Sequence, residues 1–452
     1  MTWINIFIIF YMPGLFSLHG GSTEGSASFG SRAAMGMVTL IAMDKAAALL
    51  FKSKKWTFPS ALAVMVGVFL TLCDLRKYNS NLADGISDAL SPSVSLIKAW
   101  LPLFFVPPLV VLPLKMHLLK GMGLQLSAVV AIGSILSLTS AGLFAQMMTS
   151  LFPTAEKNAG EPKVALKSAP LPSLPPLRAP AIATAACLVA SKALPYLVPS
   201  APSAVRAVIQ GTFGAAATVT GYIAGTKLPA KVKKIAHPVL ICAAVTTGLL
   251  GLFAYINGLS TASVLTQYFG SGSFRGSGDI ISSMLGPAII SFGIQLYQYR
   301  DMLKENALRV VTTTAFSAGF GLTSSAFLAK IFKLAPMQTA LAPLTRCITT
   351  PLALAGARLT GADPSLSAFI VVITGILGAS LGESVLELVG VKEPVSVGLA
   401  VGAGAHGLGA AATAYDPVKF ASAVVSMTLT GLWTVALMSY TPIRQWLVKL
   451  SL

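Results

Sequence analysis

The chain has 452 residues, of which 54% are hydrophobic and only 10% are charged. Soluble globular chains carry about 25% charged residues. So few charges cannot cover so much apolar surface, so the composition excludes a soluble fold. The excess of 32 basic over 15 acidic residues lies in short clusters between apolar runs. This pattern argues against nucleic acid as a partner and favours lipid headgroups and an anionic solute.

Apolar runs separated by glycine, proline and charge clusters predict an all-α, polytopic membrane protein with about 12 transmembrane helices, several of them broken by Gly or Pro. We expect one of thirteen runs, the short 181–198, to lie at the interface or to re-enter. In chain order the runs are 33–51, 57–75, 94–114, 122–150, 181–198, 204–226, 235–257, 280–299, 306–332, 336–358, 366–389, 394–414 and 418–441.

A proline-rich stretch from Glu156 to Pro180 divides the chain. Proline at that density cannot form a helix and favours an extended linker. We therefore expect a four-helix membrane part over 33–150, a linker over 151–180 and a larger membrane part over 181–452. Residues 1–32 contain an apolar stretch followed by small residues, which we interpret as a leader or targeting segment. An extra apolar helix is the alternative.

The sequence contains no catalytic constellation. GxSxG, P-loop and HExxH motifs are absent, and the four cysteines show no metal-ligand spacing with the four histidines. His406 is the only histidine deep in a late apolar run, and no nucleophile stands near it in the sequence. We therefore expect no enzyme activity, no catalytic residues, no metal and no cofactor.

The run 336–358 is interrupted by the sequence Thr349-Thr350-Pro351. Pro351 lacks the N–H that the carbonyl four residues earlier needs, so the helix kinks or splits there. A bilayer tolerates such a break only where it is buried or lines a cavity. The two threonine hydroxyls can replace the missing bonds or bind a ligand. Arg346, near mid-depth, costs about 2.5–3.5 kcal/mol on insertion scales unless it is paired or hydrated.

A later run is interrupted by four glycines between Gly402 and Gly409, with His406 among them. Each glycine weakens a helix by about 1 kcal/mol relative to alanine. A third candidate break is Gly286-Pro287. Paired interrupted helices indicate a transporter's substrate site. The alternative is that the small residues only allow close helix packing.

Several motifs, in chain order, resemble a known family. The stretches that carry the resemblance are Asp44-Lys45, 58–62, 97–114, 285–288, 349–351, 372–379 and 402–409. The first three are similar to LrgA and the others to LrgB, a member of the LrgB/CidB-like membrane proteins. Bacteria keep LrgA and LrgB as separate proteins, so the single chain resembles the plastid LrgA–LrgB fusion translocators of plants and algae.

The resemblance implies a secondary carrier of the chloroplast inner envelope that exchanges glycolate and glycerate in photorespiration. It makes 33–150 an LrgA-like part and 181–452 an LrgB-like transport part. A homo-oligomer is a further expectation. Two alternatives stay open: a holin- or antiholin-like pore or regulator of membrane permeability, and a carrier for another monocarboxylate such as pyruvate. The resemblance carries these LrgB-like positions over as site residues: Gly286, Pro287, Thr349, Thr350, Pro351, His406 and Gly407.

We expect the breaks at Thr349–Pro351 and Gly404–Gly407 to face one another. Their backbone N–H groups and threonine hydroxyls would bind the substrate carboxylate, with Arg346 providing the compensating charge. His406 would hydrogen-bond the 2-hydroxyl or carry a coupling proton, because an unperturbed imidazole titrates at about pH 6.5. We expect the LrgA-like part to be a scaffold or to support oligomerisation.

Overall fold

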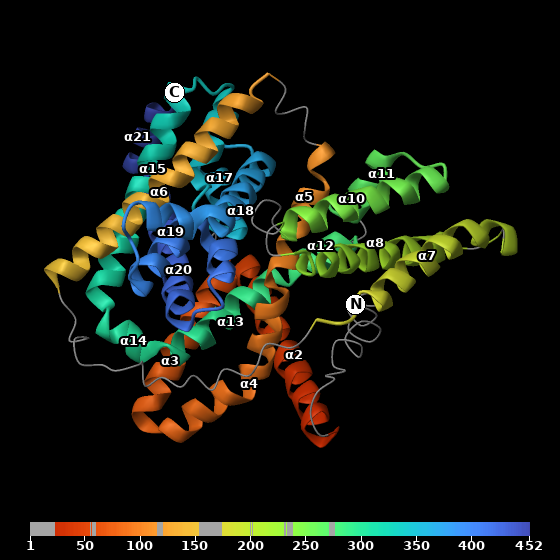
Figure 1. The fold of residues 1–452 in the computed structure, drawn as a ribbon, viewed down its shortest axis with the longest axis horizontal. Coiled ribbons are helices and arrows are strands. Elements are labelled where there is room, and N and C mark those ends of the chain that lie inside the picture. The colour runs from red at the N-terminus through yellow and green to blue at the C-terminus, as the bar shows by residue number, and fades with distance from the viewer. Residues whose placement is uncertain are drawn as a thin grey trace. The chain divides into compact units, whose positions relative to one another are not determined.

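The computed structural model describes residues 23–54, 56, 60–114, 121–152, 174–198, 200, 202–229, 232, 238–270 and 276–452, apart from the side chains of 23–29, 195, 302, 351 and 365. Every regular element within these residues is a helix (Figure 1), which confirms the all-α prediction. Most of the predicted leader lies outside the described residues, as does the linker between residues 152 and 174. Residues 23–32 belong to the helix that also contains the first apolar run.

Eight helical segments of the described residues are long and apolar enough to cross a membrane. They confirm a polytopic membrane protein. Four other helices have at least 19 residues without meeting that measure: α3 (Ser60–Tyr78), α7 (Arg178–Leu197), α8 (Ser203–Thr226) and α15 (Ala307–Ile331). The eight segments are Gly30–Ser53, Ser80–Leu114, Gly123–Leu151, Pro238–Ile256, Ser277–Gln298, Leu366–Leu388, Pro394–Ala412 and Pro417–Ser439.

The chain packs into two compact units, each built from separate segments. The first unit comprises Met1–Lys45, Asp84–Leu114 and Ser168–Ser291, and the second comprises Ala46–Ala83, Lys115–Lys167 and Phe292–Leu452. These two units are defined by packing, and each combines segments that are distant in the sequence. The LrgA-like and LrgB-like parts are instead continuous stretches of sequence, and that division stays a prediction.

The first unit contains a helix that is broken twice near its proline-rich end. Side chains of neighbouring helices bond backbone carbonyls near the breaks. Tyr222 Oη of α8 donates to Ala99 O at 2.8 Å, and Thr247 Oγ1 of α10 donates to Val110 O at 3.2 Å. Side chains thus replace the helical bonds that proline removes. The helices of this unit are α2 (Thr23–Ser53), α4 (Ser80–Trp100), η1 (Leu101–Phe105), α5 (Val106–Val110), α7, α8, α10 (Pro238–Ile256), α11 (Thr261–Tyr268), α12 (Ser277–Ser283) and the start of α13 (Leu285–Gln298).

The second unit is the larger bundle, and three of its helices begin at an acidic residue followed by proline. Asp363, Glu393 and Asp416 each accept hydrogen bonds from backbone N–H groups of the first helical turn, as N-caps do. The helices of this unit are α3, α6 (Gly123–Leu151), α14 (Arg300–Glu305), α15, α16 (Met337–Leu341), η4 (Ala342–Thr345), α17 (Thr350–Thr360), α18 (Pro364–Leu388), α19 (Pro394–Ala412), α20 (Pro417–Ser439) and α21 (Thr441–Ser451).

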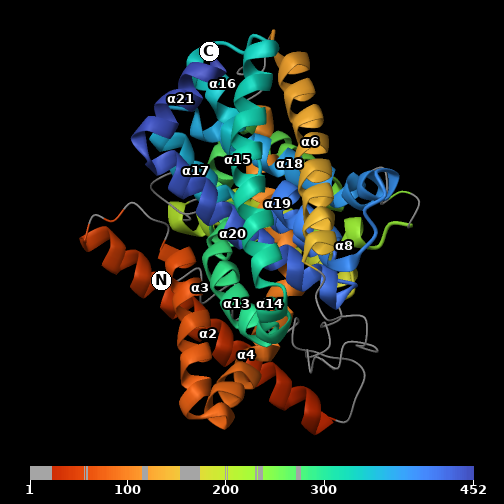
Figure 2. The ribbon, with the colours of Figure 1, turned by 90° about the vertical axis from the view of Figure 1, so that its left-hand side faces the viewer.

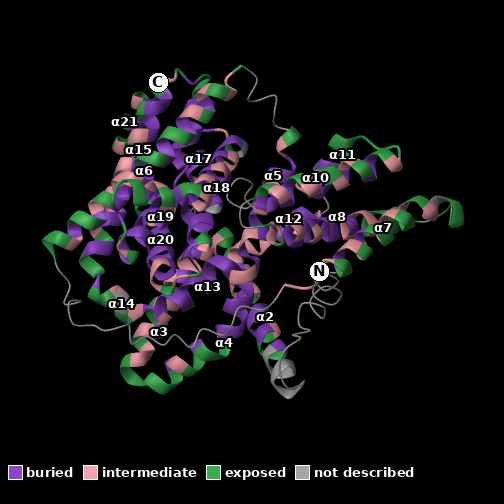
Figure 3. Ribbon diagram, viewed as in Figure 1, coloured by how far each residue is buried: buried purple, intermediate pink, exposed green. Residues whose placement is uncertain are grey.

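Helices α19 and α20 form the most deeply buried pair of this bundle (Figure 3). A Cβ added at Gly398 or Gly402 would overlap the backbone of Lys419 or Ala423. The two backbones therefore approach closely along glycines four residues apart, a small-residue contact typical of membrane helices. Ser426 Oγ adds a bond to Leu399 O at 2.6 Å.

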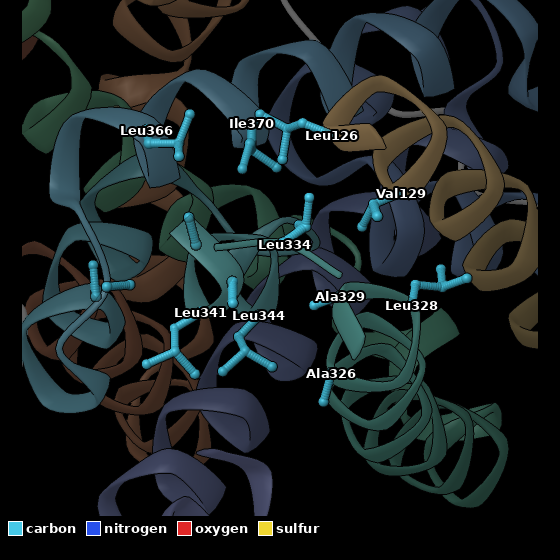
Figure 4. Packing of buried hydrophobic residues seen from close by; sticks show 14 of the residues in the cluster. Leu126, Val129, Ala326, Leu328, Ala329, Leu334, Leu341, Leu344, Leu366 and Ile370 are labelled. Atoms are coloured by element: carbon cyan, nitrogen blue, oxygen red, sulfur yellow. The ribbon is translucent and has the colours of Figure 1, made fainter. Parts of the chain in front are cut away.

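Helices α6 and α15 run side by side (Figures 1 and 2) and close one wall of the bundle. Leucine, valine and alanine side chains from α6, α15, α16, η4 and α18 meet beside them in one apolar cluster (Figure 4). The labelled members are Leu126, Val129, Ala326, Leu328, Ala329, Leu334, Leu341, Leu344, Leu366 and Ile370. This cluster fixes the helices that carry the candidate site.

Candidate functional site

The predicted break at Pro351 is present as a complete interruption of the helix. The 3-10 helix η4 ends at Thr345, residues 346–349 are non-helical, and α17 begins at Thr350. Pro351 lies in the first turn of α17, where its missing N–H breaks no helical bond. The proline therefore starts a new helix and leaves an unwound segment before it.

Arg346 opens this unwound segment and is completely buried, with 0% of its surface exposed. Its Nε donates to Ser325 Oγ at 2.8 Å, and its Nη2 donates to Ser137 Oγ at 2.7 Å and to Ser324 Oγ at 3.4 Å. Ser324 and Ser325 lie on α15 and Ser137 lies on α6. Neutral hydroxyls from two helices thus hold the guanidinium in place.

The charge of Arg346 has no counter-charge among the described residues, and its buried Nη1 has no hydrogen-bond partner. An arginine side chain stays protonated in proteins. A buried charge without an opposite charge is costly. An anion at Nη1 would supply both the missing charge and the missing acceptor, and a carboxylate matches the planar guanidinium in two parallel bonds.

Space for the guanidinium comes from α6. A Cβ at Gly133 would lie 2.9 Å from both Cζ and Nε of Arg346. Real Cβ atoms do not approach so closely, so a larger residue at this position would displace the side chain.

The N-terminus of α17 adds a second positive feature four residues after Arg346. No side chain caps this 11-residue helix, although Thr349 occupies the N-cap position. Thr349 and Thr350 are both buried, and Thr350 Oγ1 has no hydrogen-bond partner. Uncapped N–H groups and the helix dipole favour an anion at such an end.

The second predicted break is also present, and it is located at His406 itself. His406 has φ 42° and ψ −137° inside α19, a conformation that costs a non-glycine residue about 1–3 kcal/mol. The neighbouring glycines Gly402 and Gly404 instead allow other helices to pack closely. Gly402 packs on α20 as described above, and a Cβ at Gly404 would lie 3.1 Å from the Leu138 side chain. The interruption of the helix therefore lies at His406, while Gly402 and Gly404 allow close helix packing.

The imidazole of His406 is completely buried against α18. Its Nε2 lies 2.8 Å from Val371 O, and its Nδ1 has no partner. Space for the ring comes from Gly375, where a Cβ would lie 2.6 Å from Cε1. Thr374 is on the same face of α18, by helical spacing from Val371, and its buried Oγ1 also has no partner.

Consecutive residues of α6 contact both breaks. Ser137 accepts the bond from Arg346, and Leu138 lies against Gly404, two residues before His406. The structure therefore brings Arg346 and Gly404 to neighbouring residues of α6. Thr349 and Thr350 follow Arg346 by three and four residues in the chain.

Two predicted site residues are in the first unit. Gly286 and Pro287 lie in the first turn of α13, after the interruption that separates it from α12. A Cβ at Gly286 would overlap the Asp44 carboxylate, and Asp44 pairs with Lys45 at 3.1 Å. The neighbour of Gly286 is thus this ion pair. The remaining predicted position, Gly407, is buried next to His406.

Sequence reasoning missed the serines that hold Arg346. They are small polar residues at ordinary helical positions, and only the fold pairs Ser137 with an arginine 209 positions later. The adjacent pair Ser324-Ser325 is a faint sequence signal, since two hydroxyls cover neighbouring sides of one helical turn.

A second buried arginine in the same unit has a full partner. Arg309 on α15 donates from Nη1 and Nη2 to the two carboxylate oxygens of Glu393, and from Nη2 to Ser396 Oγ at 2.6 Å. Burial raises the pKa of Glu393, but the hydrogen bond and charge of Arg309, together with bonds from Ser396, lower it by more. The net pKa lies below the ordinary value of 4.5.

The described residues thus define an integral membrane protein with broken helices, in which a buried cation without a counter-ion lies in the unwound segment between η4 and α17. They contain no cluster of three or more His, Cys, Asp or Glu side chains that could hold a metal ion.

Comparison with known proteins identifies the family. The model of the LrgB-like family matches residues 218–442. The chain is 33% identical over 392 residues, 86% of its length and 75% of the relative's, to plastidal glycolate/glycerate translocator 1, chloroplastic, of Arabidopsis thaliana. It is 31% identical to antiholin-like protein LrgB of Bacillus subtilis, over 37% of this chain and 72% of that protein. Uncharacterized protein YwbG of Bacillus subtilis is 29% identical over 48% of this chain and 91% of its own.

The chain belongs to the LrgB-like family, as its motifs predicted. The relationship supports a membrane transport protein. No solved structure matches it.

Proposed function

We propose that this protein is a secondary carrier that exchanges glycolate and glycerate across the chloroplast inner envelope. The observation that carries the proposal is Arg346, a buried guanidinium held by three serines with one nitrogen unpartnered and no carboxylate in reach among the described residues. A protein that needed Arg346 only for stability would supply a counter-ion, as it does for Arg309. A site that takes up an anion instead requires the charge to be unpaired.

The geometry favours a small monocarboxylate. One guanidinium nitrogen, the Thr350 hydroxyl and the uncapped start of α17 together match one carboxylate. We take the proposed substrates and location from the translocator relative, which matches most of this chain. Its name gives glycolate and glycerate as its substrates and describes it as chloroplastic. Photorespiration is the process in which these two acids would be exchanged.

The extent of the family match supports the division of the chain, because the model of the LrgB-like family matches residues 218–442. We expect the remaining N-terminal part, 33–150, to be LrgA-like. Since α6 lies in this part and Ser137 holds Arg346, we assign it a direct role in positioning the anion site, beyond that of a scaffold.

The test is uptake of labelled glycerate into proteoliposomes that contain glycolate, glycerate, pyruvate or no solute. We expect saturable uptake that depends on internal glycolate or glycerate. Thr350→Ala should raise the KM of this exchange while the protein still folds in the membrane. Exchange with pyruvate alone would retain the carrier and overturn the substrate.

The name of the antiholin-like relative supports a second candidate, a pore or regulator of membrane permeability. The same experiment separates the two. A pore predicts a leak that neither saturates nor responds to the internal solute, and that persists in Thr350→Ala.

A further inference from the structure

We infer that His406 determines the selectivity of the site for 2-hydroxy acids over 2-oxo acids, by accepting a hydrogen bond from the substrate hydroxyl at Nδ1. The inference rests on the proposed function, since it deepens the same site. It assigns one substrate group, the hydroxyl on C2, to one atom of the protein.

The first step is the position of the ring proton. Nε2 lies 2.8 Å from Val371 O. A carbonyl oxygen only accepts hydrogen bonds, so Nε2 must carry the proton and donate it. In the neutral ring Nδ1 then presents a lone pair, and this lone pair has no partner among the described residues.

The second step is the charge of the ring. A second proton on His406 would place an imidazolium, fully buried, in the same unit as the uncompensated Arg346. No carboxylate of the described residues pairs with either group. A buried charge without a counter-charge is costly, so the neutral ring with an accepting Nδ1 is favoured.

The third step is what the site offers a ligand. The carboxylate that neutralises Arg346 is itself only an acceptor, so it cannot satisfy Nδ1. A hydroxyl on the adjacent carbon can donate to Nδ1 and accept from Thr374 Oγ1, the other unpartnered group on the face of α18 that holds the ring. A 2-oxo acid has no proton to donate, so its oxygen would face the Nδ1 lone pair.

The strained backbone supports a role for the side chain itself. Glycine adopts the conformation at 406 readily, and glycines surround this position. A chain that retains histidine at φ 42° therefore gains something from the imidazole.

The test measures inhibition of labelled glycerate uptake by matched acids in proteoliposomes. Lactate and pyruvate differ only in the hydroxyl and carbonyl on C2, and methoxyacetate retains the oxygen of glycolate without its proton. We expect lactate to inhibit at a concentration at least about tenfold lower than pyruvate, and glycolate at least about tenfold lower than methoxyacetate, the effect of leaving one buried acceptor unpaired.

Two variants then assign this ratio to His406. His406→Gln retains an amide N–H that can donate to Val371 O but removes Nδ1, and His406→Gly removes the ring while relaxing the backbone. Both should transport glycerate with the lactate-to-pyruvate ratio reduced to about one, a change that loss of packing alone does not produce. Leu399→Ala, at a buried position of α19 without such an acceptor, serves as the control.

The outcomes are distinguishable. Saturable uptake that lactate and pyruvate inhibit equally in the wild-type protein would overturn this inference alone, and that comparison needs no variant to fold. A wild-type ratio that persists in both variants would overturn it as well. If His406→Gln loses only its response to an imposed pH gradient, His406 carries a coupling proton and the assignment is wrong. A leak without saturation would remove the proposed function and this inference together.

Discussion

The second unit contains two buried arginines, of which one has a carboxylate partner and the other has none. Arg309 is 4% exposed and meets both carboxylate oxygens of Glu393, while Arg346 is 0% exposed and meets only serine hydroxyls. Both side chains involve α15: Arg309 belongs to this helix, and Arg346 donates a hydrogen bond to Ser325 on it. The paired arginine ties the start of α19 to α15. The unpaired one leaves a positive charge available in the interior.

The difference teaches how stability and function can be separated within one bundle. Removing Arg309 leaves a carboxylate without its partner, so the folded state should suffer. Removing Arg346 deletes a charge that nothing neutralises, so the folded state should not suffer while anion binding should. The experiments below test this contrast, starting with the largest expected effect.

Arg346→Met should eliminate most transport. Loss of one partner of a buried charge pair costs about 2–5 kcal/mol, which corresponds to a rise of at least about 30-fold in the KM for glycerate. Apolar replacement of a buried charge is neutral or stabilising, so the unfolding temperature in detergent should not fall. Uptake assays and thermal unfolding of the same preparation measure both quantities. A variant that transports normally would remove Arg346 from the site.

Arg309→Met should reduce stability and leave transport nearly unchanged, the opposite of the result for Arg346→Met. It breaks charged hydrogen bonds worth about 1.5–3 kcal/mol, and it should lower the unfolding temperature while transport per folded molecule stays within about twofold. The double variant Arg309→Met with Glu393→Gln should recover part of the loss, since no lone charge remains. A fall in transport with unchanged stability would contradict the structural assignment of this pair.

The Arg309–Glu393 pair should also weaken in acid. The pKa of the Glu393 carboxyl in the folded state lies below its ordinary value of 4.5. The stability that the ion pair contributes is therefore fully present above pH 4.5, and it is lost as the pH falls through the folded-state pKa. The difference in unfolding temperature between wild type and Arg309→Met should therefore shrink below pH 4.5. A constant difference down to the lowest attainable pH would argue against the ion pair.

Thr350→Val should raise the KM about fivefold without loss of stability. It removes a buried hydroxyl that has no partner in the protein, and a hydrogen bond to a substrate is worth about 1 kcal/mol. Thr360→Val on the same helix is the matched control, because Thr360 Oγ1 already bonds Gly356 O at 2.9 Å. The control should lose a little stability and no affinity. Equal effects of both substitutions on KM would contradict the assignment.

Gly133→Ala should produce the smallest change. Its Cβ would meet the Arg346 guanidinium at 2.9 Å and shift it by a fraction of an ångström, which should raise the KM about threefold. Gly319→Ala on α15 has open space around the added Cβ and should leave transport unchanged. Identical kinetics for both variants would mean that the position of the guanidinium is not critical.

Much of the fold follows from local sequence. Pro351 and the glycine-rich stretch predicted two broken helices, because a missing N–H or Cβ acts within one turn and needs no knowledge of distant residues. Arg346 was likewise a candidate, because a lone cation in an apolar run is costly wherever the chain folds.

The remaining features depend on tertiary contacts. Nothing local indicates that Ser137 meets Arg346 or that the α19 break occurs at His406 rather than at a glycine beside it. Gly402 and Gly404 are used for packing against α20 and α6, which leaves the strained conformation to a histidine. The partners on other helices determine this choice, and the sequence does not show which helices are neighbours.

The glycine contacts between α19 and α20 have a mechanical consequence. Helices whose backbones touch at Gly398 and Gly402 cannot slide past one another without collisions, so we expect these two helices to move as a single rigid body. Any motion that opens the anion site first to one side of the membrane and then to the other must then bend elsewhere. The unwound segment 346–349 and the break at His406 are two described places in this bundle where no continuous helix resists such bending.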